Sequence, residues 1–219
     1  LSMVASRIKE HESSNIFAGD GKLRLLRSAV IYGANASGKS NLIKAFSFLR
    51  SFALWSAIDT DVDEPIEIQN FKLSTETENK PSSFEVIFLI ENIKYRYGCE
   101  VDRNEVHKEW LYHYPKNRES KLYVRNGAEY EIGPLFKEGR KLTSQTRKNA
   151  LFLSVVAQFN GEIAGKILLW FKRLKVVSGL DDSGYRKFTI EKTRNSEFRL
   201  EIMKFLKAGD IDIQDIDVE

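Results

Sequence analysis

The residues best suited to chemistry lie together between Gly33 and Ser40, where the chain reads Gly-Ala-Asn-Ala-Ser-Gly-Lys-Ser. This stretch matches G-x-x-x-x-G-K-[ST], the pattern of a P-loop that binds the phosphates of a nucleoside triphosphate. The glycines let the backbone curl so that successive amides point at an anion. Lys39 would reach the β- and γ-phosphates as a catalytic residue, and the Ser40 hydroxyl would be a ligand of Mg²⁺. The stretch therefore predicts a site for ATP and magnesium.

A P-loop needs a strand before it and a helix after it, and the sequence predicts both. Residues 24–32 form an apolar run that indicates a buried strand. Residues 38–53 carry apolar side chains at helical spacing, which predicts a helix whose positive N-terminal end faces the phosphates. We expect the phosphates to be held by Gly33, Ala34, Asn35, Ala36, Ser37, Gly38, Lys39, Ser40 and Asn41.

From Phe84 onward the apolar residues recur with a period of two, which is typical of antiparallel strands. Residues 84–90, 93–101, 106–114 and 121–125 alternate in this way, and Trp110, Tyr112 and Tyr114 share one face. A turn near Glu91-Asn92 separates the first two strands, and Asn126-Gly127 predicts a hairpin turn because both residue types tolerate positive φ. We expect a meander of four or five strands, packed on one face and solvated on the other.

The last part of the chain predicts helices. An apolar stripe fits one helix at Ile163, Ile167, Trp170, Phe171 and Leu174. Asn195 or Ser196 would cap another helix, ending at Gly209, with Phe198, Ile202, Phe205 and Leu206 pointing inward. Residues 175–178 predict a short strand between them.

These patterns predict an α/β fold, a P-loop NTPase with an antiparallel β-meander subdomain and a C-terminal helical segment. The P-loop core would occupy residues 1–58, the β subdomain residues 59–140 and the helical segment residues 141–219.

The segment from Tyr32 to Ala45 resembles the ABC-type ATPase heads of the SMC, RecF and Rad50 group, where an asparagine at the position of Asn35 and a Ser-Asn pair such as Ser40-Asn41 are typical. Residues 1–5, Glu109–Tyr112 and Leu151–Ser154 are similar to bacterial AAA-family ATPases that accompany abortive-infection proteins and Septu- and retron-associated defence systems. The resemblance implies an SMC-like head lobe that dimerises through ATP and controls an effector protein such as a nuclease.

In such heads a Q-loop glutamine follows the antiparallel subdomain and contacts the metal and the attacking water. Gln158 stands in the right order to be this residue, with a catalytic and metal-binding role. The alternative is a surface glutamine after a helix.

A complete head also has a signature motif, a Walker B strand ending in Asp-Glu and a switch histidine. The stretch Val86–Glu91 resembles Walker B but lacks the aspartate, and a hairpin is favoured there. Residues 178–182 (Ser-Gly-Leu-Asp-Asp) are a weak match to a signature or a Walker B end. We therefore expect the chain to be the N-terminal lobe of a head that binds nucleotide but hydrolyses it poorly alone.

Charge is unevenly distributed along the chain, although the net charge is only +3. Residues 111–175 carry 13 basic and 5 acidic groups, which predicts a face for nucleic acid or another anionic partner. A solvated face is the alternative. No run of 18 apolar residues indicates a membrane span, and no signal peptide opens the chain, so we expect a cytoplasmic protein without a membrane partner.

Other candidates for chemistry are weaker. His11, His107 and His113 lack metal-ligand spacing, and Cys99 reads as a core thiol. Three functions remain open. The first is an SMC-like ABC-class ATPase in anti-phage defence. The second is a RecF-like DNA-repair ATPase that contacts DNA through residues 111–175, and the third is a regulator that senses nucleotide without hydrolysing it.

Overall fold

The computed structural model describes residues 1–7, 10–18, 23–59, 61–69, 80–177, 183–211 and 213–217. The chain divides into two compact units, Leu1–Leu174 and Lys175–Glu219. The divisions expected at residues 58 and 140 fall inside the first unit and stay a prediction. Residues 178–182, the weak signature-like segment, lie outside the described residues.

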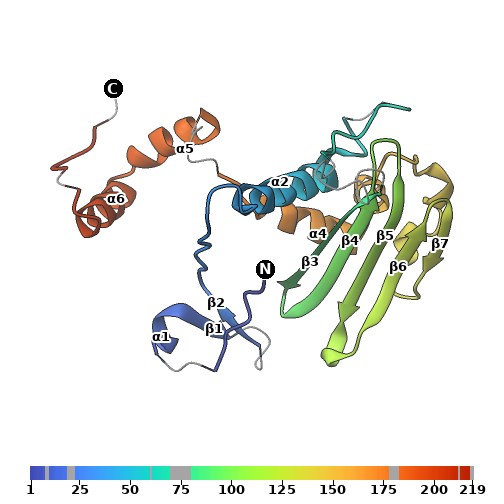
Figure 1. The fold of residues 1–219 in the computed structure, drawn as a ribbon, viewed down its shortest axis with the longest axis horizontal. Coiled ribbons are helices and arrows are strands. Elements are labelled where there is room, and N and C mark those ends of the chain that lie inside the picture. The colour runs from blue at the N-terminus through green and yellow to red at the C-terminus, as the bar shows by residue number, and fades with distance from the viewer. Residues whose placement is uncertain are drawn as a thin grey trace. The chain divides into compact units, whose positions relative to one another are not determined.

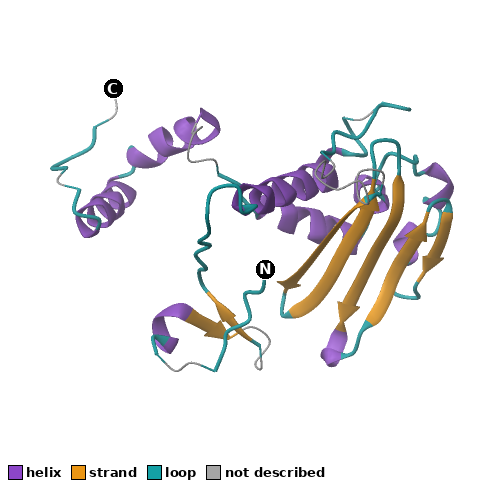
Figure 2. Ribbon diagram, viewed as in Figure 1, coloured by secondary structure: helices purple, strands orange, loops and turns teal. Residues whose placement is uncertain are grey.

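A five-stranded antiparallel sheet dominates the first unit (Figures 1 and 2). Its strands pair in chain order: β3 (Ser82–Ile90), β4 (Ile93–Val101), β5 (Val106–Tyr114), β6 (Ser120–Asn126) and β7 (Glu129–Ile132). The predicted meander is confirmed, with five strands. The Walker B look-alike is strand β3, and its Glu91 lies in the hairpin turn and pairs with Lys166 at 3.4 Å.

Two hairpin turns of the sheet contain residues with positive φ. Between β3 and β4 both turn residues take it, with φ of 51° at Glu91 and 63° at Asn92. Between β6 and β7 the turn lies one residue later than expected, because Asn126 pairs with Glu129 and the loop is Gly127-Ala128. Here only Gly127 has positive φ, 59°. Asn126 is held in the ladder by its pairing with Lys108 on β5.

One face of the sheet packs against helices α2 (Lys39–Trp55) and α4 (Glu162–Arg173), as the ribbon shows (Figure 1). Aromatic rings fill this interface: Phe48 and Phe84 have centroids 4.9 Å apart, and Phe88 and Trp170 are 4.1 Å apart. Cys99 is fully buried on the same face, and burial raises the pKa of its thiol. The core thus lies between the sheet and these helices.

The opposite face carries Trp110, Tyr112 and Tyr114, as the period of two predicts. Each is half-buried and held by a polar neighbour. The indole of Trp110 donates to Glu85 at 2.8 Å, and the side chains of Arg96 and Lys94 lie over the rings of Tyr112 and Tyr114.

The strand expected over residues 24–32 forms only in part. Strand β2 is limited to Arg24–Leu26 and pairs with β1 (Ile16–Ala18), beside the short helix α1 (Glu12–Asn15). Beyond it the chain is irregular, and Val30, Ile31 and Tyr32 are 72%, 43% and 88% exposed. A buried parallel strand needs neighbouring strands to accept its backbone hydrogen bonds, and no described strand pairs with residues 27–32; the one bond there runs from the amide of Arg27 to the carbonyl of Asn15 at 2.8 Å, within the described residues.

Short turns and helices follow the sheet. The 3₁₀ turns are η1 (Pro115–Asn117), η2 (Lys137–Gly139) and η3 (Thr143–Gln145), and α3 spans Phe152–Gln158. Among the described residues no single helix is long and apolar enough to span a membrane; α3 and α4 meet that criterion only together, across a bend of 108°.

The second unit contains α5 (Ser183–Thr193) and α6 (Ser196–Ala208). Asn195 caps α6 as predicted, because its side chain accepts from the amides of Glu197 and Phe198. The expectation that Phe205 points inward is wrong: it is 79% exposed, and Met203 is buried instead. Residues 175–177 are irregular rather than a strand, and α5 lacked a sequence prediction.

The packing around Gly98 on β4 makes a testable prediction. A Cβ there would clash with the ring of Trp110 and lie 2.6 Å from the carbonyl oxygen of Phe84. Gly98→Ala should therefore lower the free energy of unfolding by about 1–3 kcal/mol, as overpacking does. Urea denaturation followed by circular dichroism measures it.

Gly165 within α4 is the matched control, because a Cβ there meets nothing within 4 Å. Gly165→Ala should raise the stability by about 0.5–1 kcal/mol through helix propensity. Equal effects of the two substitutions would contradict the packing assigned to Gly98.

Candidate nucleotide-binding site

The loop before α2 adopts a curled conformation that depends on positive φ at two residues. Ala36 has φ of 61° and Gly38 has φ of 88°, so the chain turns sharply into the helix at Lys39. The Lys39 ammonium folds back across the loop and donates to the carbonyl oxygens of Gly33 and Ala34, each at 2.7 Å. The loop thus surrounds its own cation.

Backbone donors at the start of α2 remain available to a ligand. Within the described residues, the amides of Gly38, Lys39 and Ser40 donate to no carbonyl or side chain. These are the orphan amides of a helix N-terminus, and they carry its partial positive charge. Residues 33–38 and Ser40 are exposed to solvent, and Lys39 is half-buried. Unpaired amides, an ammonium and a hydroxyl are the donors and the metal ligand that fit a triphosphate with Mg²⁺.

Gln158 is not brought to this loop. It is the exposed last residue of α3, and α3 is joined to the other end of α2 through Ser154, whose hydroxyl bonds to the carbonyl of Ala53. At about 1.5 Å per residue, Ala53 lies some 20 Å along the helix from Lys39, whereas Gln158 is one turn from Ser154. A metal-binding role for Gln158 stays a prediction and would require this arrangement to change.

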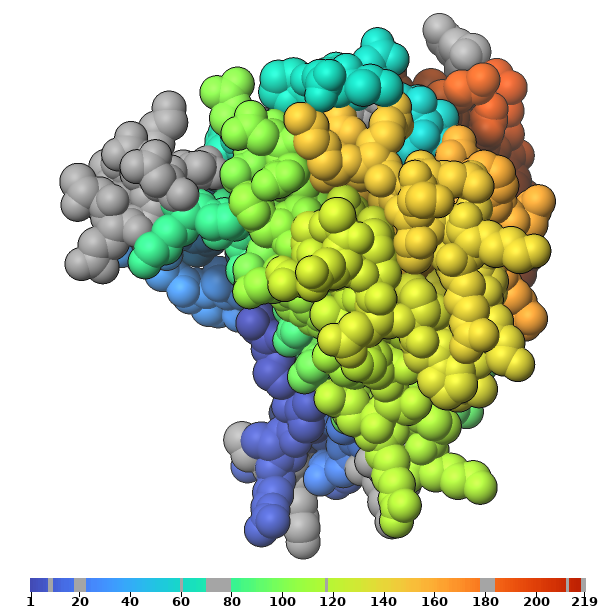
Figure 3. Space-filling model, turned by 90° about the vertical axis from the view of Figure 1, so that its right-hand side faces the viewer, coloured from blue at the N-terminus to red at the C-terminus, as the bar shows by residue number. Residues whose placement is uncertain are grey.

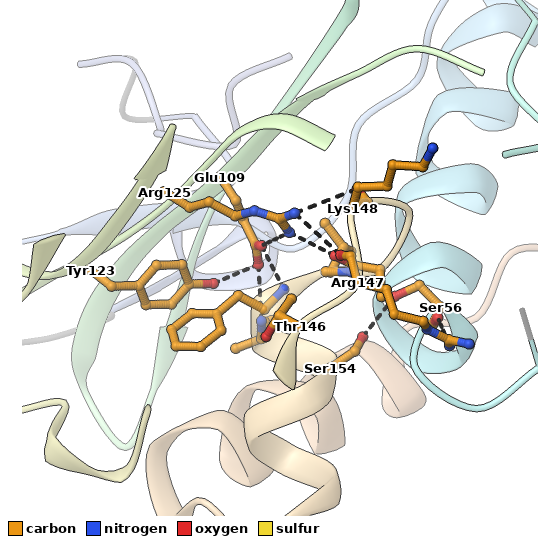
Figure 4. Close-up of polar contacts among 12 residues, drawn as sticks. Ser56, Glu109, Tyr123, Arg125, Thr146, Arg147, Lys148 and Ser154 are labelled. Carbon is orange, nitrogen blue, oxygen red and sulfur yellow. Dashed lines mark hydrogen bonds and ion pairs between the residues drawn. The ribbon is translucent and has the colours of Figure 1, made fainter. Parts of the chain in front are cut away.

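A serine pair fastens the C-terminal end of α2 to the start of α3. Ser56 follows the last turn of α2, is buried, and donates to the hydroxyl of Ser154 at 3.1 Å (Figure 4). The Ser56 hydroxyl also accepts from the amide of Leu151 at 3.1 Å. The helix that begins at the phosphate-binding loop is therefore bonded directly to α3.

A buried carboxylate holds α3 to the sheet. Glu109 on β5 is 0% exposed and accepts from the amides of Phe152 and Leu153 at 2.6 and 3.0 Å. The hydroxyl of Tyr123 donates to the same carboxylate at 2.6 Å (Figure 4), and that of Tyr97 donates to it at 3.1 Å. Burial, and then the charge of Glu109, raise the pKa of both tyrosines well above the ordinary value, so they remain donors. Glu109 acts as the N-terminal cap of α3.

Arg125 lies opposite Glu109 on β6 and is almost as buried, with 2% of its side chain exposed. Its guanidinium lies 3.9 Å from the Glu109 carboxylate and donates to the carbonyl of Ala150 at 2.7 Å. Weaker bonds reach the carbonyls of Arg147 and Lys148. Arg125 thus fixes the segment that leads into α3 (Figure 4).

A second carboxylate caps α4 in the same way. Glu138 in η2 accepts from the amides of Glu162, Ile163 and Ala164, at 2.8, 3.3 and 3.0 Å. Such carboxylates stabilise a helix in two ways. They accept hydrogen bonds from its unpaired N-terminal amides, and their negative charge interacts favourably with the positive end of the helix dipole. Both α3 and α4 are therefore capped by glutamates that lie outside them.

This network was not predicted from the sequence. One signal was present: Glu109 and Arg125 occupy inward positions of alternating strands, where apolar residues are expected, and opposite charges there suggest a cross-strand pair. Glu109 and the Leu151–Ser154 segment both belong to stretches that resemble one group of ATPases. Their contact was visible only in the structure.

Comparison with known proteins identifies one family. The family model described as "AAA domain, putative AbiEii toxin, Type IV TA system" matches residues 28–215, which include the loop, the sheet and the helices after it. No curated protein and no solved structure matches the chain.

The Glu109 network makes a prediction about stability. In Glu109→Gln the new amide group would face only donors, so at least one buried donor would lose its acceptor. We expect the free energy of unfolding to fall by about 3 kcal/mol, the scale for breaking a buried charge pair. Glu129→Gln on the exposed face of β7 is the control and should change it by less than about 0.5 kcal/mol. Similar urea midpoints for the two variants would contradict the role given to Glu109.

Proposed function

The chain belongs to the family of AAA domains described as putative AbiEii toxins of type IV toxin–antitoxin systems, and on that premise we propose that it binds ATP with Mg²⁺ at Gly33–Ser40. Completed by the catalytic groups of a whole ATPase site, the domain hydrolyses the bound nucleotide. The free amides at the start of α2, beside the Lys39 ammonium and the Ser40 hydroxyl, carry this proposal.

Each group has a defined task in the proposed complex. The amides of Gly38, Lys39 and Ser40 bind phosphate oxygens, and the Lys39 ammonium leaves the carbonyls of Gly33 and Ala34 to bind the β- and γ-phosphates. The Ser40 hydroxyl binds Mg²⁺, and Asn41 lies in the first turn of α2 next to it. The Lys39 ammonium would thus exchange its two hydrogen bonds to carbonyl oxygens for two hydrogen bonds to phosphate oxygens.

The proposal extends to a complete SMC-like, ABC-class head. Two such heads would form a homo-oligomer with ATP enclosed between them. ATP would favour the closed state because that state has the higher affinity for it. The exposed loop supports this arrangement, because a surface supplied from elsewhere can cover it. The family description supports a role in defence by abortive infection, in which closure controls an effector protein such as a nuclease.

Removal of the loop lysine tests ATP binding. Lys39→Ala should weaken binding of ATP and Mg²⁺ about 10- to 100-fold, because a charge-assisted bond contributes about 1.5–3 kcal/mol. Isothermal titration measures the affinity. Lys44→Ala, which removes an exposed lysine from the same helix, is the control and should bind as the wild type does. Equal affinity of wild type and Lys39→Ala would overturn the proposed site.

Removal of the proposed metal ligand is a separate test. Ser40→Ala should abolish the gain in ATP affinity that Mg²⁺ gives the wild type, while leaving affinity in EDTA unchanged. A Mg²⁺ dependence that survives this substitution would contradict the role of Ser40. Tight binding without turnover in the intact protein would favour a nucleotide-sensing regulator over an ATPase.

A further inference from the structure

The connection between the sheet and α3 carries an unbalanced positive charge. Residues 133–149 contain five basic side chains (Lys137, Arg140, Lys141, Arg147 and Lys148) and one acidic side chain, Glu138. The carboxylate of Glu138 is turned inward to the amides of α4 and is not paired with any of these cations. The one acidic side chain of this segment is therefore bonded to the start of α4 and not to the neighbouring cations.

Three of the five cations remain exposed, and they have no partner among the residues that the structure describes. Arg147 donates to the backbone carbonyls of Ser56 and Ala57, and Lys148 pairs with Asp63 at 3.2 Å. In contrast, the side chains of Lys137, Arg140 and Lys141 are exposed, and no ion pair or hydrogen bond reaches them from the described part of the chain. We call these three residues the cationic turn.

Buried residues on either side of these cations hold the backbone of the cationic turn in place. Phe136, Gly139 and Leu142 are buried and recur every three residues, which is the period of a 3₁₀ helix. The ring of Phe136 packs on that of Tyr123 with centroids 5.0 Å apart, and a Cβ on Gly139 would lie 2.7 Å from the ring of Phe152. Successive i→i+3 hydrogen bonds run from Gly133 to Gln145.

This periodicity places the cations together on the surface. Lys137 and Arg140 are three residues apart and therefore eclipse each other along the 3₁₀ turn, with Lys141 next to them. The chain from about residue 130 to 150, drawn in yellow, lies at the surface on the face shown in Figure 3. Because the i→i+3 hydrogen bonds already order the backbone, binding loses little backbone conformational entropy.

We infer that the cationic turn binds the phosphate backbone of a nucleic acid. Arginine and lysine neutralise phosphates, and hydroxyl and amide side chains such as those of Thr143, Ser144 and Gln145 bond to phosphate oxygens. A lipid surface fits less well, because Leu135 is the only large apolar side chain exposed in residues 133–149, and interfacial segments insert several. The site is separate from the phosphate-binding loop and does not depend on the proposed nucleotide.

Salt-dependent binding to a 20-base-pair DNA duplex, followed by fluorescence anisotropy, tests this inference. The variant Lys137→Gln/Arg140→Gln/Lys141→Gln should bind at least tenfold more weakly at about 0.1 M salt than the wild type. The plot of log affinity against log salt should become shallower by about 2–3, since each lost phosphate contact removes about 0.9 from its slope.

A control with the same loss of charge separates this site from net charge. Lys116, Arg118 and Lys172 are exposed cations elsewhere in the first unit. Their triple glutamine variant should keep the wild-type affinity and slope. Circular dichroism and urea denaturation verify that both variants fold. Lys39→Ala should also bind DNA normally, so failure of the ATP site and failure of this site are distinguishable.

Three results would overturn the inference: no binding by the wild type, equal loss in both triple variants, or unchanged binding by the cationic-turn variant. A single-stranded RNA of the same length distinguishes the two nucleic acids, and preference for either supports the site. Binding to phosphatidylserine vesicles in place of both nucleic acids, lost in the cationic-turn variant, would assign the surface to a membrane instead.

Discussion

The structure depends on one buried charge, the carboxylate of Glu109. A carboxylate removed from water is costly unless hydrogen bonds and opposite charge replace its hydration. Here two backbone amides, two tyrosine hydroxyls and the guanidinium of Arg125 surround it. The carboxylate can be buried only if α3 begins at Phe152, because two of its donors are the first amides of that helix.

This constraint reaches the phosphate-binding loop through α3 and α2. Glu109 fixes the start of α3, and the hydroxyls of Ser56 and Ser154 join that helix to the C-terminal end of α2. The sheet therefore holds α2 at the end opposite the loop, while residues 33–38 lie exposed at the other end. The N-terminal amides of α2 are therefore held in a fixed direction, while the loop around them stays open to solvent.

The same chemistry recurs at α4 with a second consequence. Glu138 satisfies the first amides of α4, and in doing so it is withdrawn from the cations on either side of it. A residue that stabilises a helix terminus thus also sets the charge of the neighbouring surface.

The sequence by itself determined the features that depend on neighbours along the chain. The P-loop pattern, the helix after it, a meander of four or five alternating strands and the Asn195 cap each follow from the spacing of residues close together along the chain. Only the tertiary structure decided the rest. Residues 27–32 are irregular because no described strand pairs with them, and Gln158 lies far from the loop because Ser154 binds the opposite end of α2. The partners of Glu109 come from three other segments, β4, β6 and α3, and local periodicity, which specifies a face, cannot specify what that face will contact.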